Sequence, residues 1–197
     1  GIYSLLSVTA TVPPKAQPDQ DDHDLLRQCL QGNTDSFRIL YQRYERRVRA
    51  MLYQLVGTTH LDDLVQEVFL RAWKGLPTFR QTAQFSTWLY RITWNVAIDH
   101  QRANARHHNR LQAVAQHLSP QQDTPDVLHL HYQDLVQRGL KHLSFDHRTV
   151  LVLHDLEELP QKEIAAILEI PIGTVKSRLF HARAAMRQFL HQEGVQV

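Results

Sequence analysis

The residues best suited to chemistry lie near the C-terminus, where basic side chains recur along one stretch. Between residue 172 and the end of the chain stand Lys176, Arg178, His181, Arg183, Arg187 and His191. Glu193 is the only acidic residue in that stretch. Guanidinium and ammonium groups bind phosphate through charge and hydrogen bonds, so a segment this one-sided in charge favours a polyanionic partner. The chemistry that this pattern predicts is binding, not bond making.

The elements that position these residues are a short helix, a tight turn and a second helix that runs toward the C-terminus. Residues 161–168 carry an apolar stripe with Ile164, Ile167 and Leu168, and the residues Glu169-Ile170-Pro171 follow. Proline disfavours helix at the residue before it and suits the start of the next helix, which we therefore expect to begin near residue 172. This pattern is typical of a helix-turn-helix, whose second helix enters the major groove of DNA. A solvated basic face on an ordinary helical hairpin is the alternative.

Composition places the chain among globular proteins with segregated charge. It has 197 residues, is 43% hydrophobic and has a net charge of only +2. No apolar run is long enough to span a bilayer, so we expect no membrane insertion. Residues 101–122 contain no acid, whereas acids cluster at 19–24, 62–67 and 155–163. This segregation suggests separate surfaces for DNA and for a protein partner. The single cysteine, Cys29, excludes an internal disulfide and is compatible with a reducing cytoplasm.

Helical periodicity dominates from residue 24 onward and predicts an all-α protein of two domains. Apolar residues recur at spacings of three and four along residues 37–55 and again along 61–72. Gly57 is expected to end the first of these helices. We predict a flexible leader over 1–22, a first helical domain over 23–106, a polar linker over 107–130 and a second domain over 131–194.

A third helix of the first domain is expected to begin after Phe85, with Ser86 as its N-terminal cap. Winding at 100° per residue places the core residues of this helix on one face: Trp88, Leu89, Ile92 and Val96. Trp94 comes out nearly opposite that face, so an isolated helix would expose it beside arginines. The bases of a single-stranded nucleic acid stack on exposed aromatic side chains placed in this way. The alternative is that Trp94 packs under a neighbouring helix or loop.

Other chemistries find little support in the chain. The 13 histidines are scattered, and the pairs at 107–108 and 129–131 lack a cysteine or carboxylate at the spacing of a metal site. No HExxH motif, phosphate-binding loop or nucleophile with a recognisable partner is present. We therefore expect no metal site, no cofactor and no enzymatic activity.

Three blocks in order carry a resemblance to a known family: residues 63–69 (DLVQEVF), residues 85–92 (FSTWLYRI) followed by Asn95 and Asp99, and residues 171–178 (PIGTVKSR). The chain from about residue 24 to 190 resembles the extracytoplasmic-function group, or group 4, of the sigma-70 family of bacterial RNA polymerase sigma factors. The resemblance implies a sigma region 2 helical bundle, a flexible linker and a sigma region 4 helix-turn-helix.

In such factors the helix corresponding to residues 62–69 docks on the clamp helices of the polymerase's largest subunit. The resemblance therefore assigns polymerase binding to Asp63, Leu64, Gln66 and Glu67, an acidic and apolar set suited to a basic partner helix. It also implies contact with the flap of the second-largest subunit, a cytoplasmic location and an anti-sigma protein that masks the binding faces of both domains.

The resemblance also assigns promoter DNA to two helices. The minus-ten element is expected to meet Trp88, Arg91, Trp94, Asn95, Ile98 and Arg102, with Asn95 holding a flipped base and the arginines taking phosphates. The minus-thirty-five element is expected to meet Thr174, Lys176, Ser177, Arg178, Phe180, His181 and Arg183. Of these, Arg178 and Arg183 are candidates for phosphate contact or for internal support.

Two departures from the family pattern affect the second domain. His181 stands where related proteins carry arginine, so a bidentate contact with guanine is lost. Glu169 stands in the turn where glycine is common, so we expect either a left-handed position strained by its side chain or a slight shift of the turn. The rival to a sigma factor is a two-domain helix-turn-helix regulator that binds an operator without polymerase.

Overall fold

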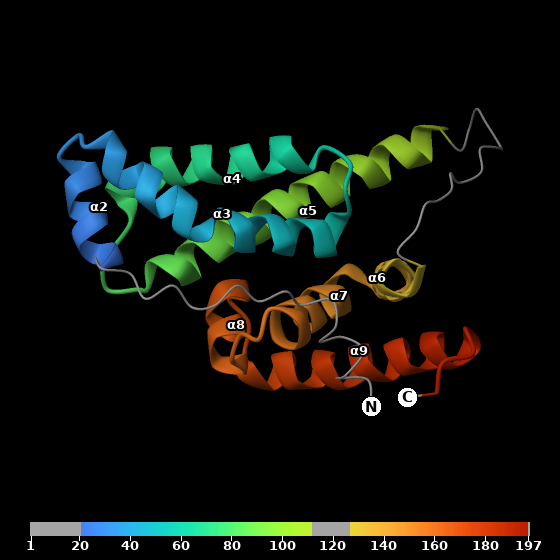
Figure 1. The fold of residues 1–197 in the computed structure, drawn as a ribbon. Helices are drawn as coiled ribbons and strands as arrows, with labels where there is room; N and C mark the ends of the chain where they lie inside the picture. The colour runs from blue at the N-terminus through green and yellow to red at the C-terminus, as the bar shows by residue number, and fades with distance from the viewer. Residues whose placement is uncertain (1–20, 112–126, 197) are drawn as a thin grey trace.

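The computed structural model describes residues 21–111 and 127–196, and every regular element within these ranges is a helix. The predicted leader and linker lie largely outside the described residues. The first domain consists of α2 (Asp22–Leu30), α3 (Thr34–Val56), α4 (Leu61–Gly75), the short 3-10 helix η1 (Leu76–Thr78) and α5 (Phe85–Leu111). Figure 1 shows these helices together above the helices of residues 145–192 (α7, α8 and α9). The all-α prediction is confirmed for the described part.

Local signals account for the ends of these helices. The side chain of Asn33 accepts hydrogen bonds from the backbone N–H groups of Asp35 and Ser36, which starts α3. Gly57 ends α3 with φ 84°, and its N–H donates to the carbonyl of Tyr53. A residue with a Cβ would be disfavoured at that φ, which explains the glycine predicted there.

The core of the first domain is formed by apolar residues from α2 to α5. The largest of those that are fully buried are Leu25, Leu26, Leu40, Met51, Leu52, Leu55 and Leu89. Val96 is also buried, and Trp88 and Ile92 are half-buried against the same core. The stripe predicted for α5 therefore faces inward as expected.

The second domain consists of α6 (Val127–His142), α7 (Phe145–Leu151), the π-helical segment η2 (Val152–Leu156), α8 (Gln161–Leu168) and α9 (Ile172–Gln192). Pro160 and Pro171 stand at the N-caps of α8 and α9. Glu169 ends α8 in the left-handed region at φ 55° and ψ 44°. The helix-turn-helix and its strained turn are thus where the sequence placed them.

Helix α5 departs from its predicted limits at both ends. It begins at Phe85, so Ser86 lies inside the first turn, and the Trp88 N–H donates to the carbonyl of Gln84. It continues to Leu111, beyond the domain boundary expected at residue 106, because helical hydrogen bonding does not require the apolar period that fades there. The flanks of the predicted linker, residues 107–111 and 127–130, belong to α5 and α6.

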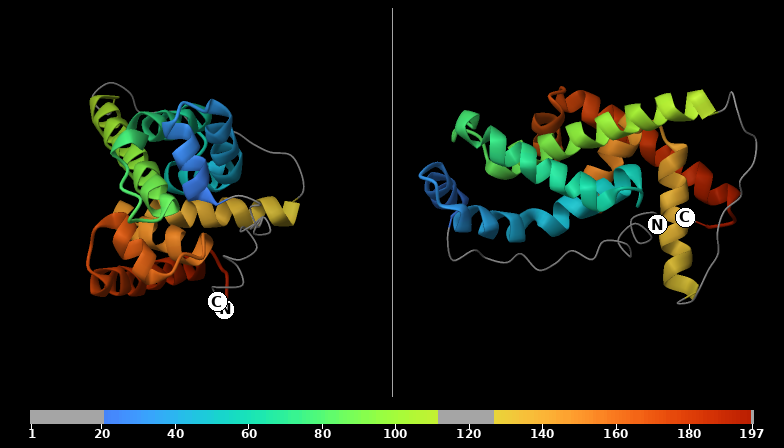
Figure 2. Two further views of the ribbon diagram at one scale, coloured as in Figure 1. Left: turned by 90° about the vertical axis from the view of Figure 1, so that its left-hand side faces the viewer. Right: turned by 90° about the horizontal axis from the view of Figure 1, so that it is seen from above.

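The two domains pack against each other. Figure 1 and the views in Figure 2 show α8 lying beside the N-terminal half of α5, with α9 on the outer side of the second domain. Side chains of both domains interdigitate at this boundary, where Arg47 of α3 pairs with Glu157 of the second domain, its Nε lying 3.4 Å from Oε2. Within residues 21–111 and 127–196, each helix is too short or too polar to span a lipid bilayer.

Candidate functional site

Helix α4 borders an open groove with apolar walls and an acidic rim. The groove has a volume of about 540 Å³, and its apolar walls come from α3 and α4: Phe37, Tyr41, Phe69, Leu70 and Trp73. Asp63, Gln66 and Glu67 line the same groove. Leu70 and Trp73 are exposed despite their size, and large exposed apolar side chains in a groove indicate a partner surface.

Three of the four predicted polymerase-binding residues therefore lie together at the groove. Asp63 is largely exposed, and Glu67 pairs with Arg71, whose Nε lies 2.7 Å from Glu67 Oε1. Arg71 also pairs with Asp99 of α5 at 3.1 Å, and these hydrogen-bonded carboxylates raise its pKa. Leu64 is half-buried against the domain core and does not line the groove.

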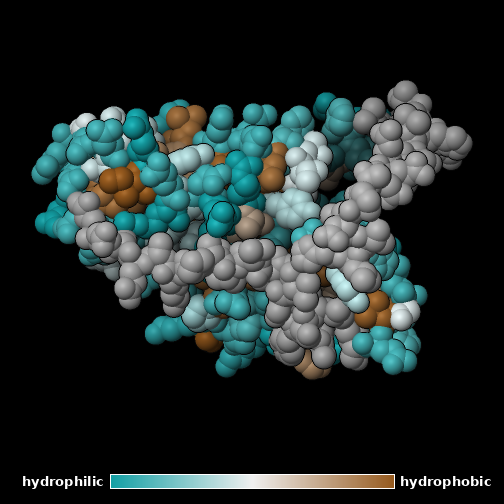
Figure 3. Space-filling view, viewed as in Figure 1, coloured by the Kyte–Doolittle hydropathy of each residue, from teal (hydrophilic) through white to brown (hydrophobic). Residues whose placement is uncertain are grey.

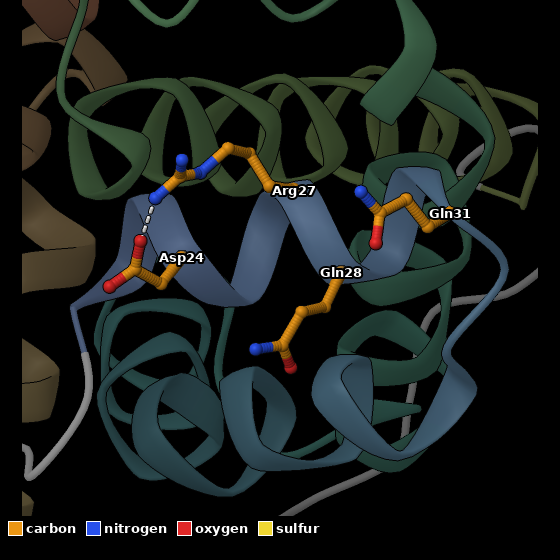
Figure 4. Close-up of a pocket in the computed structure, with 4 residues that line it drawn as sticks. All are labelled: Asp24, Arg27, Gln28 and Gln31. Carbon is orange, nitrogen blue, oxygen red and sulfur yellow. Dashed lines mark hydrogen bonds and ion pairs between the residues drawn. The ribbon is translucent and has the colours of Figure 1, made fainter.

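The groove contrasts with a second hollow, which is polar and shallow. That hollow has a volume of about 270 Å³ and is lined by Asp24, Arg27, Gln28 and Gln31, all from α2 and its C-cap. Figure 4 shows Asp24 and Arg27 paired with each other. Figure 3 shows small hydrophobic patches in the part of the molecule where α2 and α4 lie, on a face that is otherwise mostly hydrophilic.

Helix α5 presents only part of the predicted minus-ten set to solvent. Asn95 and Arg102 are exposed, and Ile98 is half-buried. Trp88 is packed inside the domain: its ring lies 5.0 Å from that of Phe79 and 5.8 Å from that of Phe85. Asn95, Ile98 and Arg102 follow one another at helical spacing, so they share a face that DNA can reach.

Arg91 and Trp94 meet the second domain instead. Arg91 Nη2 donates to the carbonyl of Ala166 at 2.7 Å, and its Nη1 lies 3.1 Å from Glu169 Oε1. Trp94 is half-buried, and its indole N–H donates to Thr149 Oγ1 at 3.4 Å. Of the two alternatives for Trp94, packing against a neighbouring helix is the one observed, because the second domain lies against the face opposite the domain core.

Helix α9 carries an exposed row at its N-terminal half. Lys176, Ser177, Phe180 and His181 are exposed, and Phe180 is the most exposed large hydrophobic residue of those described. Thr174 is half-buried at the start of the helix. Arg178 is half-buried and lies 3.6 Å from Asp146 of α7. The ring of His181 stacks on that of His147 at 6.1 Å, so α7 supports the row from one side.

Arg183 has a structural role. Its Nε donates to Asp155 Oδ2 at 3.0 Å and its Nη2 donates to Oδ1 at 2.7 Å. Asp155 is buried, and its Oδ1 also lies 2.8 Å from His154 Nδ1. A bidentate pair with a buried carboxylate holds α9 against η2 and leaves Arg183 poorly placed for DNA. Of the two roles considered for Arg183, internal support fits this geometry.

Comparison with known proteins decides the family. Residues 40–107 match the model of sigma-70 region 2, and residues 133–186 match that of sigma-70 region 4. The chain is 33% identical over 173 residues to the ECF RNA polymerase sigma-E factor of Haemophilus influenzae, an alignment that covers 82% of this chain and 91% of that relative. The chain belongs to the extracytoplasmic-function sigma factors.

Other relatives of this sigma factor agree in length as well as in sequence. The ECF sigma factor SigW of Bacillus subtilis is 32% identical over 179 residues, covering 84% of this chain and 94% of that relative. The solved structure of CnrH in complex with the cytosolic domain of CnrY matches with a TM-score of 0.67 and 26% identity, over 87% of this chain and 97% of that one. The sigma factor RpoE of Bartonella quintana, solved with the anti-sigma factor NepR, matches with a TM-score of 0.63 and 26% identity, over 79% and 96%.

Sequence reasoning about this sigma factor missed the aromatic half of the groove. Phe37 and Tyr41 belong to the apolar stripe of residues 37–55, and Trp73 follows the stripe of 61–72; a helical stripe does not reveal where two helices diverge and leave such side chains in a groove. Sequence reasoning also missed Asp146 and His147 of α7 and Asp155 of η2, which contact α9 side chains. An acid so close to an apolar run was a signal for Asp155, since a buried carboxylate needs a cationic partner.

Proposed function

We propose that this sigma factor binds core RNA polymerase through the groove beside α4, places it at promoters with two separated elements, and captures melted bases with α5. The groove carries the proposal, because it combines acidic groups with exposed aromatic and aliphatic side chains on one surface. Nucleotide transfer belongs to the polymerase, and the sigma factor itself makes no bond. It acts in the cytoplasm.

The occupant of the groove is a helix of the polymerase with basic and apolar residues, in the clamp of the largest subunit. Asp63, Gln66 and Glu67 supply charge and hydrogen bonds at the rim, while Leu70 and Trp73 offer apolar area at the centre. Complementary charge at the rim of an interface sets orientation and association rate, while buried aromatic residues supply most of the affinity. Leu64 supports the rim from beneath. The second domain meets the flap of the second-largest subunit.

The minus-ten element is read on α5 by Asn95, whose amide can pair with the edge of a base flipped from the stack. Ile98 flanks it, and Arg102 takes a phosphate, which sets register without reading sequence. Trp88 does not contact the base. Its ring packs on Phe79 inside the domain and so holds the loop before α5 in place. Trp94 becomes available to DNA only if the second domain moves away.

The minus-thirty-five element is read on α9. Lys176 suits guanine acceptors, Ser177 is permissive, and Phe180 can contact a thymine methyl group. Thr174 and Arg178 lie at the edge of this surface and are suited to phosphate. His181 replaces an arginine contact with a single hydrogen bond, so base preference at its position is weaker.

We also propose that an anti-sigma protein binds this factor and masks both domains. Its structural relative RpoE of Bartonella quintana was solved in complex with the anti-sigma factor NepR, and CnrH was solved in complex with the cytosolic domain of CnrY. The exposed groove beside α4 supports the proposal, since an apolar surface of this kind requires cover when polymerase is absent.

The test is transcription in vitro with bacterial core polymerase and a library of randomised promoters, with and without the protein. Transcripts that depend on the protein and share two separated sequence elements support the proposal and give the consensus. Tight binding to one duplex operator without polymerase, combined with inactivity on a competent core, would favour the operator-binding regulator instead.

A further inference from the structure

Arg91 belongs to the predicted minus-ten surface, yet its guanidinium is bonded to the second domain. Its guanidinium meets the end of α8 through three contacts: Nη2 donates to the Ala166 carbonyl at 2.7 Å, Nε donates to the Ile167 carbonyl at 3.4 Å, and Nη1 lies 3.1 Å from Glu169 Oε1. All three acceptors are oxygens, and they converge on one fork of N–H donors.

This set of oxygens has the chemistry of a phosphate group. The last carbonyls of a helix lack intrahelical partners and carry the negative end of the helix dipole. The carboxylate of Glu169 adds a formal charge beside them. An arginine recognises a phosphate by the same means, with several N–H groups directed at clustered, negatively charged oxygens.

The backbone of Glu169 offers an independent reason to single out this residue. It adopts φ 55° and ψ 44°, a conformation that a side chain with a Cβ disfavours and that glycine adopts freely. Glycine would therefore end α8 without strain. What glycine cannot supply is the carboxylate that faces Arg91.

Other contacts hold the two domains in the same arrangement. Arg47 of α3 pairs with Glu157 of the second domain, and Arg148 Nη1 of α7 donates to the Leu55 carbonyl at the end of α3 at 2.9 Å. The indole of Trp94 reaches Thr149 at the same boundary. In this arrangement the second domain contacts both Arg91 and Trp94 and leaves each of them half-buried.

We propose that the C-terminal end of α8, with Glu169, is an internal substitute for DNA phosphate that occupies Arg91 until promoter DNA displaces it. The α8 end and single-stranded DNA then compete for one guanidinium, and the closed arrangement lowers the affinity of the free chain for DNA. This inference rests on the proposed function, because it takes Arg91 as a contact for DNA.

Three variants of the full chain test the competition. Glu169→Gly removes the charge and the strain, and Glu169→Gln removes the charge but keeps the left-handed side chain. Glu158→Gly is the matched control, because Glu158 is also exposed, also has a positive φ of 57°, and is not among the groups that contact Arg91 in the described residues. Each change removes one negative charge.

The domain arrangement is read from energy transfer between fluorophores on cysteines introduced at the exposed positions Lys74 and Gln188, with Cys29 replaced by alanine. The probe is a pool of single-stranded DNA oligonucleotides of mixed sequence, since phosphate contacts do not depend on sequence. Because exposed ion pairs contribute little, we expect both Glu169 variants to open at about two- to fivefold lower DNA concentration than the wild type. The Glu158→Gly chain should open at the same midpoint DNA concentration as the wild type.

Equal midpoints for all four chains would overturn the inference, as would an equal shift in Glu158→Gly and Glu169→Gly. Polymerase-dependent transcription by the same four proteins separates this failure from a failure of the proposed function. Transcription with equal midpoints rejects only the role of Glu169. If no chain supports transcription on a competent core, the proposed function fails and the role of Arg91 fails with it.

Discussion

Arg148 of α7 donates a hydrogen bond at 2.9 Å to the backbone carbonyl of Leu55, in the last turn of α3, although the two residues belong to different domains. The same guanidinium donates to the carbonyls of Leu140 at 2.8 Å and Leu143 at 3.3 Å. Burial lowers its pKa. One buried cation thus joins the ends of helices from both domains, and its loss has consequences for both.

Replacing this arginine should lower stability strongly. Arg148→Met keeps apolar volume but leaves several buried carbonyls without a donor, so we expect the free energy of unfolding of the second domain to fall by about 2–4 kcal/mol. Urea unfolding followed by circular dichroism measures it. Arg138→Met is the control, since the exposed Arg138 pairs with Asp134 and Glu193 at the surface and should cost less than about 1 kcal/mol. Equal losses in the two variants would contradict the role given to Arg148.

The groove beside α4 predicts the effect of a charge reversal. Glu67→Lys places a cation where a basic polymerase helix is expected and also removes the partner of Arg71, so polymerase-dependent transcription should be lost. The helical content should remain, because Glu67 lies at the surface. Transcription assays and circular dichroism measure the two effects. Asp62→Lys is the control on the same helix, since Asp62 pairs with Arg49 and does not line the groove. Wild-type transcription by the Glu67 variant would reject the docking surface.

The role of Asn95 separates recruitment from promoter opening. Asn95→Ala removes an exposed amide without touching the core, so polymerase should still reach the promoter while the open complex forms less readily. Losing one base-specific pair, a difference of about 1–3 kcal/mol, should reduce opening by about 5- to 150-fold. Permanganate footprinting reports the melted bases and gel shift reports the closed complex. An equal loss in both assays would show that Asn95 does not act on the flipped base.

The stability of the packed domain arrangement should depend on pH through Glu157. Burial raises the pKa of this carboxyl above its ordinary value of 4.5, although Arg47 beside it acts in the opposite direction. A raised pKa means that the closed state favours the protonated form, so this contribution is present at low pH and is lost as pH rises through the raised pKa. Glu157→Gln imitates the protonated form and should abolish this trend.

The measurement for Glu157 is urea unfolding of the wild type and of Glu157→Gln from about pH 4 to 8, a range that begins below the ordinary pKa of 4.5. The stability advantage of the variant should grow as pH rises through the raised pKa and then level off, since only the wild type carries a buried charge above it. An advantage that stays constant over the whole range, or that shrinks with pH, would mean that folding does not raise the pKa of Glu157.

The sequence alone determined what depends on local pattern. Apolar period placed the helices, and Pro171 placed the start of α9. Gly57 was expected to end α3, and Glu169 was recognised as a side chain in a turn where glycine is common; both have positive φ. These properties follow from the chain within a few residues, so they can be read without knowing what lies nearby. The order of three motifs then indicated the family, which the comparisons confirmed.

The tertiary structure decided which side chains are available. Arg91 and Trp94 are contacted by the second domain, Arg183 is held by Asp155, and the aromatic groove combines residues of α3 and α4. A helical period tells which face of a helix is apolar but not what packs on the opposite face. That depends on contacts between residues far apart in the chain, such as Arg91 with Ala166, which only the folded arrangement brings together.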